Sequence, residues 1–250
     1  MLPVLFKLGR IEIHSWGLML AVAVLLGTYL VIRRGVKLDY DADRLLNLTI
    51  LVLISGIAGA RLFYVLFYAP AYYFAHPLEI LFVWQGGLVF YGGLLAALTA
   101  GWWYVRRQGW SFWDTADLVA PVLALGYGIV RIGCFLNGCC YGKVTSPRWG
   151  VIFPAVDNFY RYPTQLYSSA FGFLLFFFLL WWEKRKKFPG QVFLTFLILY
   201  GAGRAVIEAF RDNLRVWGPV TISQLISFLL IPAGIIAYVY LKKQKNNSGG

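Results

Sequence analysis

The feature that most constrains this sequence is a succession of apolar runs, each about as long as a lipid bilayer is thick. A helix needs roughly 20 apolar residues to cross the hydrocarbon layer. Seven such runs occur, at about 15–32, 46–68, 86–105, 116–137, 163–182, 191–210 and 220–241. We therefore predict an all-α polytopic membrane protein with about seven transmembrane helices and short interfacial or re-entrant segments.

Composition and charge exclude two other classes of protein. With 60% hydrophobic and only 14% charged residues, the chain has too little polar surface to cover a water-soluble globule. Its net charge of +12 comes from Lys and Arg residues that bracket the apolar runs and do not gather on one basic face. We therefore expect no nucleic-acid partner.

The same Lys and Arg residues predict the orientation of the chain. Thirteen of them lie in the connections on one side of the membrane and seven in those on the other. The side with more Lys and Arg is expected to be cytoplasmic, because positive charge is retained there. The prediction is an extracytoplasmic N-terminus and a cytoplasmic C-terminus. We expect one transmembrane domain over residues 1–250, with an extracytoplasmic loop region at about 138–162 and a polar C-terminal tail at about 242–250.

Three arginines lie inside the apolar runs and are candidates for substrate binding: Arg61, Arg131 and Arg204. A guanidinium keeps its proton in hydrocarbon, and placing it there costs several kcal/mol. A phosphate would offset that cost, because the planar fork of arginine matches phosphate oxygens with two parallel hydrogen bonds. The alternative is that each side chain extends along its helix and places its charge in the headgroup layer.

Arg131 opens a dense polar stretch that continues to Gly142. Tyr127, Arg131 and Cys134 are spaced to lie on one helix face, and the glycines that follow predict a frayed helix end with exposed N–H groups. The three cysteines of the chain all fall between residues 134 and 140, and C-x4-C-C is not a recognised zinc spacing. We therefore predict no metal site.

Arg204 belongs to a second constellation. Tyr200, Arg204, Glu208 and Arg211 are spaced to form one stripe on the sixth predicted span. Glu208 either neutralises Arg204 in a structural salt bridge or holds its guanidinium in place for a ligand. The fourth and sixth spans run in the same direction, so Arg131 and Arg204 are expected near the same membrane surface. Two fixed cations at the depth of a lipid phosphate indicate a phospholipid headgroup site.

Two further residues lie where a ligand could reach them. Tyr91 stands between paired glycines at 86–87 and 92–93, which would let a helix approach its neighbour or line a cavity. The alternative for Tyr91 is a single hydrogen bond within a tight helix pair. His14 begins the first span, where an interfacial anchor is the simpler interpretation. In the second span, Ser55/Gly59 and Gly56/Ala60 are small-residue pairs that favour close helix packing.

Across nearly its whole length the sequence resembles the bacterial prolipoprotein diacylglyceryl transferases, and five stretches carry the resemblance: 13–18, 86–93, 131–142, 162–167 and 200–208. The resemblance implies an inner-membrane enzyme that moves the diacylglyceryl group of phosphatidylglycerol onto the lipobox cysteine thiol of a prolipoprotein signal peptide. Glycerol phosphate would leave, and neither a metal nor a cofactor would be needed.

The resemblance also implies roles for individual residues. Arg131 corresponds to the arginine that binds phosphatidylglycerol and Arg204 to a second essential arginine. The other residues implied in the site are Tyr200, Glu208, Asn137, Gly142 and His14. Four positions depart from the family pattern: Tyr91 replaces a histidine, Cys134 an asparagine, Cys139 a glutamate and Trp16 a tyrosine. Tyr91 would then orient groups or relay the proton of the substrate thiol.

Two alternatives from other classes stay open. A phospholipid-binding membrane protein of the same fold would bind the lipid without catalysis, and the departures at 91, 134 and 139 favour that alternative. A transporter of anionic solutes could use the same arginines, but such proteins usually carry an internal repeat of broken helices, which this sequence lacks.

Overall fold

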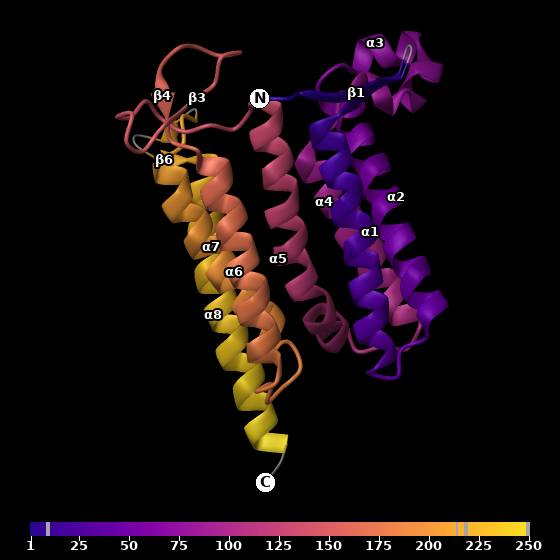
Figure 1. Ribbon diagram of the computed structural model, residues 1–250. Coiled ribbons are helices and arrows are strands. Elements are labelled where there is room, and N and C mark those ends of the chain that lie inside the picture. The colour runs from indigo at the N-terminus through magenta and orange to yellow at the C-terminus, as the bar shows by residue number, and fades with distance from the viewer. Residues whose placement is uncertain (9–10, 214, 218–219, 249–250) are drawn as a thin grey trace. The chain divides into compact units, whose positions relative to one another are not determined.

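The computed structural model describes residues 1–8, 11–213, 215–217 and 220–248. Most of them are helical (Figure 1). The α-helices are α1 (Ser15–Val36), α2 (Ala42–Phe67), α3 (Pro70–Ala75), α4 (Phe90–Arg107), α5 (Phe112–Asn137), α6 (Thr164–Glu183), α7 (Gln191–Ala209) and α8 (Ile222–Ser248). Two 3-10 helices, η1 (Pro77–Leu81) and η2 (Val83–Gln85), precede α4.

Three short antiparallel strand pairs complete the described secondary structure. They are β1 (Val4–Leu8) with β2 (Ile11–His14), β3 (Val151–Ile152) with β4 (Tyr160–Arg161), and β5 (Arg215–Trp217) with β6 (Val220–Thr221). The chain divides into two compact units. Unit 1 comprises Met1–Val31 and Ala116–Gly250, and unit 2 comprises Ile32–Thr115. The expectation of one domain over 1–250 stays a prediction.

The predicted fold class is confirmed, with one difference in the number of spans. Among the described residues, six helices are long and apolar enough to cross a membrane: α1, α2, α5, α6, α7 and α8. The predicted third span, α4, is not among them. Its 18 residues extend about 27 Å, and Arg106 and Arg107 occupy its last turn. A seventh crossing by α4 stays a prediction.

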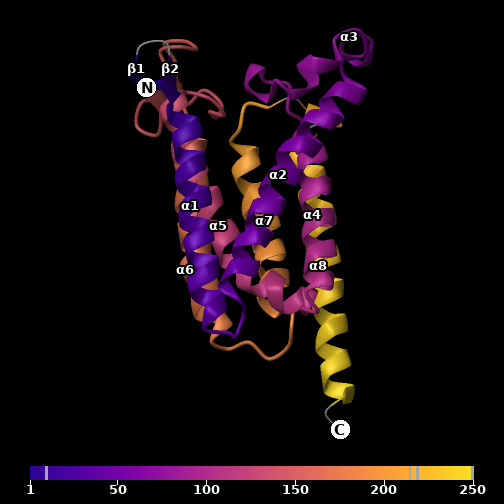
Figure 2. The same cartoon turned by 90° about the vertical axis from the view of Figure 1, so that its right-hand side faces the viewer.

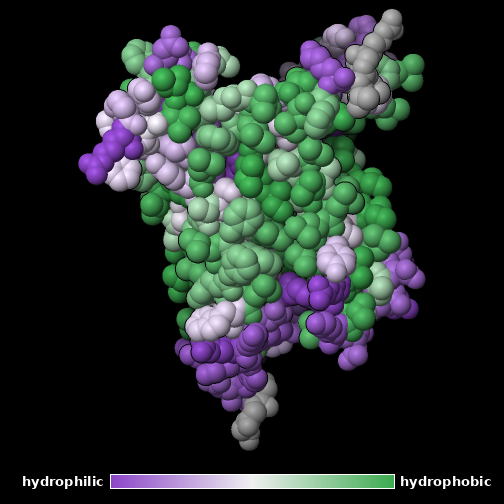
Figure 3. Space-filling model, in the orientation of Figure 1, coloured by the Kyte–Doolittle hydropathy of each residue, from purple (hydrophilic) through white to green (hydrophobic). Residues whose placement is uncertain are grey.

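The surface agrees with a membrane setting. Figure 3 shows hydrophobic residues over the middle of α6 and α8, and hydrophilic residues at the end where α8 finishes. The polar stretch predicted as a tail at 242–250 is helical as far as Ser248, because α8 continues through these residues. Lys and Gln form helices readily, so the polar stretch prolongs the helix. Residues 249–250 lie outside the described residues.

In unit 2, α2 and α4 lie side by side (Figures 1 and 2). Small residues bring the two backbones together, as the small-residue pattern in the second span predicts. A Cβ atom on Gly59 would lie 2.3 Å from the Cβ of Ala96, and one on Gly92 would lie 2.3 Å from the Cβ of Phe63. Such separations are too short for any side chain, so both positions require glycine.

In unit 1, residues from α1, α5, α6 and α7 form the hydrophobic core, with Ala124, Leu179 and Val192 almost completely buried. Gly172 lets α6 approach α5 closely, since a Cβ there would lie 2.8 Å from the Cα of Gly128. The buried carboxylate of Asp117 on α5 accepts hydrogen bonds from the N–H groups of Gly190 and Phe193, both 2.8 Å long. These bonds attach the start of α7 to α5.

The close packing of α2 on α4 generates a prediction. Replacing Gly59 by Ala adds a methyl group where none fits, and overpacking of this kind costs about 1–3 kcal/mol. We expect Gly59→Ala to lower the midpoint of thermal unfolding of the detergent-solubilised protein by several degrees. The matched control is Gly17→Ala, because a Cβ at Gly17 meets no atom within 4 Å. Equal midpoints for the two variants would contradict the packing described for Gly59.

Candidate functional site

The carboxylate of Glu208 organises the C-terminal end of α7. One oxygen, Oε2, lies 2.8 Å from Nη2 of Arg204 and 3.6 Å from Nη1 of Arg211. The other, Oε1, accepts hydrogen bonds from Thr221 Oγ1 at 3.2 Å and from the side-chain amide of Asn213. The Glu208 side chain is 0% exposed, so it is held entirely by these neighbours. Glu208 therefore fixes two arginines at once.

Arg131 approaches the same place from α5. Its guanidinium lies over the ring of Tyr127, 5.0 Å from the ring centre. Tyr127 in turn meets Tyr200 of α7 edge to face, with ring centres 5.2 Å apart. Tyr200 experiences the charges of both Arg131 and Arg204, and Arg211 experiences both as well. The structure thus brings Arg131 and Arg204 into one cluster, as the sequence predicts.

The cluster carries more positive charge than its own carboxylate neutralises. Glu208 pairs with Arg204 and Arg211 but not with Arg131, and no carboxylate in the described part of the chain pairs with Arg131. Nη1 of Arg204, Nε of Arg211 and the hydroxyl of Tyr127 are buried without a hydrogen-bond partner among the described residues. Buried donors and excess charge of this kind suit an anion with several oxygens.

Ser223 adds an uncharged contact from α8. Nη2 of Arg204 donates a hydrogen bond of 3.0 Å to Ser223 Oγ. The sequence predicts Tyr200, Arg204 and Glu208 as one stripe, and the structure confirms that they share one helix face beside Arg211. Glu208 pairs with Arg204, which confirms the salt bridge, and it leaves Nη1 of that arginine without a partner among the described residues. That Glu208 holds the guanidinium for a ligand stays a prediction.

The C-terminal end of α5 is closed by a glycine turn. Gly138 has φ +75°, its N–H donates to Phe135 O, and the N–H of Cys139 donates to Cys134 O, both at 3.1 Å. This is the Schellman arrangement, which brings the residue after the glycine back over the last helical turn. Asn137 therefore lies at the helix end, and Cys139 lies against Cys134.

The three cysteines meet at this turn. Their sulfur atoms all lie within 4.8 Å of one another. Hydrogen bonds with Cys134 and Cys139, together with the charges of Arg211 and Arg131, lower the pKa of the Cys140 thiol and favour its thiolate form. The thiols therefore lie beside the arginine cluster, which the spacing C-x4-C-C does not predict.

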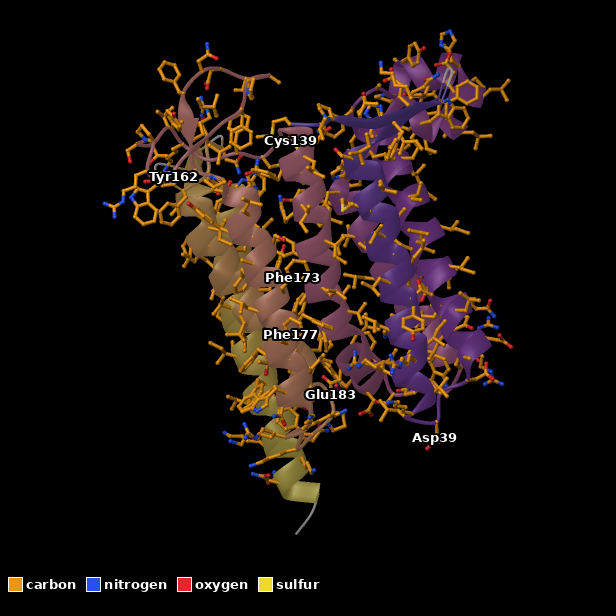
Figure 4. All side chains as sticks on the ribbon, in the orientation of Figure 1. Asp39, Cys139, Tyr162, Phe173, Phe177 and Glu183 are labelled. Carbon is orange, nitrogen blue, oxygen red and sulfur yellow. The ribbon has the colours of Figure 1, made fainter. Side chains whose placement is uncertain are left out.

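The segment after the turn is attached to α6 and α7. Thr164 Oγ1 donates to Cys140 O at 2.9 Å, and the side-chain amide of Gln165 donates to Cys139 O at 2.7 Å. The N–H of Gly142 donates to Tyr162 O at 2.9 Å, and Gly142 pairs with Arg211 as an isolated β-bridge. Cys139 and Tyr162 accordingly lie at the same end of unit 1 (Figure 4). Gly142 thus acts through its backbone, which places Arg211.

An ion-pair network holds the extramembrane loop beside this turn. Nη2 of Arg161 lies 2.7 Å from Asp157 and its Nη1 lies 2.9 Å from Asp212, the residue after Arg211. Hydrogen bonds from Arg161 hold the pKa of the Asp157 carboxyl below its usual value. Arg161 therefore connects the predicted loop region at 138–162 to the segment that carries Arg211.

Two predicted site residues belong to unit 2. Arg61 is 3% exposed, and its guanidinium donates to four backbone carbonyls, those of Glu79, Ile80, Gly86 and Gly87, at 2.7 to 3.4 Å. These bonds fold the segment around η1 and η2, so its N–H groups serve the protein's own backbone. Tyr91 is 45% exposed at the start of α4 and its ring contacts Phe90. Substrate roles for Arg61 and Tyr91 stay predictions.

His14 ends β2, and its backbone pairs with Val4. The strand pair is attached to α5 by a hydrogen bond of 2.9 Å from Leu2 N to Leu136 O. The His14 side chain is exposed, and within the described ranges no hydrogen bond or ion pair joins it to the arginine cluster. Its substrate role also stays a prediction.

Sequence reasoning missed several residues of the cluster. Arg211 lies on the predicted stripe but is not among the predicted site residues. Gln165 lies in a stretch that carries the family resemblance, but neither it nor Asn213 and Arg161 is predicted in the site. The charge balance of the stripe, with two arginines and one glutamate, points to Arg211. The other three act through side-chain hydrogen bonds and ion pairs that form only when the loops fold, which residue spacing does not reveal.

These features define a class: a multi-span membrane protein with a buried arginine cluster suited to a phosphate. Residues 3–240 match the family model described as prolipoprotein diacylglyceryl transferase. Relatives named phosphatidylglycerol–prolipoprotein diacylglyceryl transferase are similar throughout. The one from Geobacter sulfurreducens is 37% identical over 97% of this chain and 96% of its own. The one from Clostridium tetani is 38% identical over 95% and 97%. The chain belongs to the prolipoprotein diacylglyceryl transferase family.

The position of Glu208 between two arginines generates a prediction. Glu208→Gln keeps the shape but removes the only negative charge that Arg204 and Arg211 share, and breaking a buried ion pair costs about 3–5 kcal/mol. We expect the thermal midpoint to fall by roughly 5–15 °C. The control is Glu12→Gln, because Glu12 pairs with Lys7 in an exposed position. A midpoint for Glu208→Gln that matches the control would show that Glu208 does not hold the cluster together.

Proposed function

We propose that this protein transfers the sn-1,2-diacylglyceryl group of phosphatidylglycerol to the cysteine thiol of a prolipoprotein, with a thioether and glycerol phosphate as products. Membership of the family supports the reaction. The observation that carries the proposal is the arginine cluster, in which Glu208 pairs with Arg204 and Arg211 while Arg131 lies nearby without a carboxylate partner among the described residues.

The proposed reaction places a growing negative charge beside these arginines. The thiolate sulfur forms a bond to the glyceryl carbon while that carbon loses its bond to a phosphate oxygen, which leaves with the electron pair. The phosphate group therefore gains about one unit of negative charge during the step. Fixed donors in a dry site stabilise such a charge strongly, because they need no reorganisation as the charge develops.

The three arginines would have different roles in binding the phosphate. Arg131 pairs with no carboxylate of the described chain, so its guanidinium would make a bidentate contact with phosphate oxygens. Arg204 and Arg211 are held by Glu208 and each keeps one unpartnered nitrogen. Glu208 would thereby act as a positioning residue that fixes two donors, and Tyr200 lies close enough to experience the charges of both Arg131 and Arg204.

The acceptor thiol must lose its proton. We propose that the positive charge of the cluster lowers the pKa of the substrate thiol, as cationic surroundings do for thiols in general. Tyr91 would orient the thiol or relay its proton, since a tyrosine hydroxyl is in general a weak base. Asn137, Gly142 and His14 remain proposed substrate-binding residues, with Gly142 acting through the backbone contacts that place Arg211.

The proposal includes the setting of the enzyme. The acceptor would be the lipobox cysteine of a signal peptide, and the membrane would be the bacterial inner membrane. The distribution of Lys and Arg supports an extracytoplasmic N-terminus and a cytoplasmic C-terminus. In that orientation the end of α5 and the loop at 138–162 face the extracytoplasmic side, where the signal peptide of an exported precursor would be presented.

Neutralising Arg131 tests the proposed function. Purified protein is incubated with labelled phosphatidylglycerol and a lipobox peptide, and the thioether product is counted, with a Cys→Ser peptide as substrate control. We expect Arg131→Gln to lower turnover by about 100-fold or more, the usual effect of losing one such donor. Arg148→Gln is the matched variant, because Arg148 is exposed in the loop. Turnover retained by Arg131→Gln would refute the assignment of Arg131.

The same assay separates the rival functions. A phospholipid-binding protein without catalysis would bind the lipid and yield no thioether, and a transporter would show neither product nor dependence on the peptide.

The same assay also tests Tyr91. We expect Tyr91→Phe to reduce turnover, because it removes the hydroxyl and keeps the ring. Unchanged turnover in Tyr91→Phe would remove Tyr91 from the mechanism and leave the arginine cluster untouched.

A further inference from the structure

The thiols of Cys134, Cys139 and Cys140 form a cluster that the proposed transfer reaction does not use. The acceptor thiol belongs to the substrate, and these three are the only cysteines of the chain. We infer that they form a binding site for one soft metal ion of the zinc or cuprous type, placed at the end of α5.

The geometry of the sulfur atoms supports this inference. All three lie within 4.8 Å of one another. Zinc–sulfur bonds of about 2.3 Å at the tetrahedral angle place two sulfurs about 3.8 Å apart. Side-chain rotations that move each sulfur by about 1 Å or less would therefore close the site. Three thiolates complete the coordination of a cuprous ion, or leave one open position on zinc.

The backbone holds the three thiols on one side of the turn. The Schellman turn at Gly138 returns Cys139 over Cys134, with the Cys139 N–H bonded to Cys134 O. Cys140 has φ +65°, a left-handed conformation that turns the chain immediately after Cys139. Gln165 and Thr164 hold the carbonyls of Cys139 and Cys140. The backbone arrangement is thus fixed by hydrogen bonds that do not involve the sulfurs. The Cys139 thiol also donates a long hydrogen bond of 3.7 Å to Cys134 O, which it would give up on losing its proton to bind a metal.

The neighbouring charges fit a thiolate complex of this kind. Three thiolates around a divalent ion carry one net negative charge, and around a monovalent ion two. Arg131 and Arg211 both act electrostatically on Cys140, so the complex would lie beside compensating positive charge. A net anionic complex at a membrane surface needs such neighbours, because an unpaired charge is costly away from water. Without the negative charge of the thiolates, the same arginines would repel a metal cation.

Metal counting tests the site directly. The full-length protein is purified in detergent without a histidine tag, reduced, and kept free of oxygen. It is then equilibrated with Zn²⁺ or, in a separate arm, with Cu⁺ held by a chelator, and the bound metal is measured by mass spectrometry after gel filtration. We expect about one ion per chain, and less than a tenth of that in the triple variant C134S/C139S/C140S. The arm that competes better with its chelator identifies the preferred ion.

Alkylation gives a second measurement on the same samples. We expect the metal-loaded protein to resist modification of Cys139 and Cys140 by N-ethylmaleimide, and the metal-free protein to be modified at these two partly exposed thiols, as read from the intact mass. Single variants such as Cys139→Ser should weaken metal binding at least tenfold, which keeps the test open if the triple variant does not fold. Metal binding that survives the triple substitution would overturn the site. So would a failure of the reduced wild type to bind either ion, including an outcome in which two thiols form only a disulfide.

Discussion

The structure of unit 1 depends on holding three partly buried guanidiniums close together when one carboxylate pairs with only two of them. An arginine cannot shed its proton, so each of these side chains stays charged away from water and must find compensation. Glu208 compensates two of them, and Tyr127 offers its ring face to the third. The excess positive charge that remains is the physical reason to expect an anion at this place. A phosphate would lower the free energy of the whole cluster on binding.

The fold supplies what this cluster needs in position and in rigidity. Asp117 attaches the start of α7 to α5. The two helices that carry Arg204 and Arg131 are therefore fixed to each other at the ends far from these arginines. At the near end, the turn at Gly138 and the strand-like contacts of Gly142 bring Arg211 beside them. The cluster is thus built by two helices and one loop, each fixed by backbone hydrogen bonds, and the three cysteines lie within the same turn.

Sequence reasoning predicted the parts of the structure that follow from periodicity and from the cost of burying charge. The long apolar helices and the shared face of Tyr200, Arg204 and Glu208 are of this kind. It failed where the partner of a side chain is distant backbone: Arg61 is held by carbonyls 18 to 26 residues away, and no spacing rule reveals them. It also missed the thiol cluster, because a glycine turn brings the sulfurs together.

The central claim is that Arg131 and Arg204 hold one and the same phosphate, and a double-mutant cycle on lipid binding tests it most directly. The affinity for phosphatidylglycerol is measured for the wild type, Arg131→Gln, Arg204→Gln and the double variant. Two side chains that share a ligand group are coupled by about 0.5–3 kcal/mol. The account predicts that the double variant loses clearly less affinity than the two single losses added together. Losses that add to within about 0.3 kcal/mol would mean that the two arginines act independently.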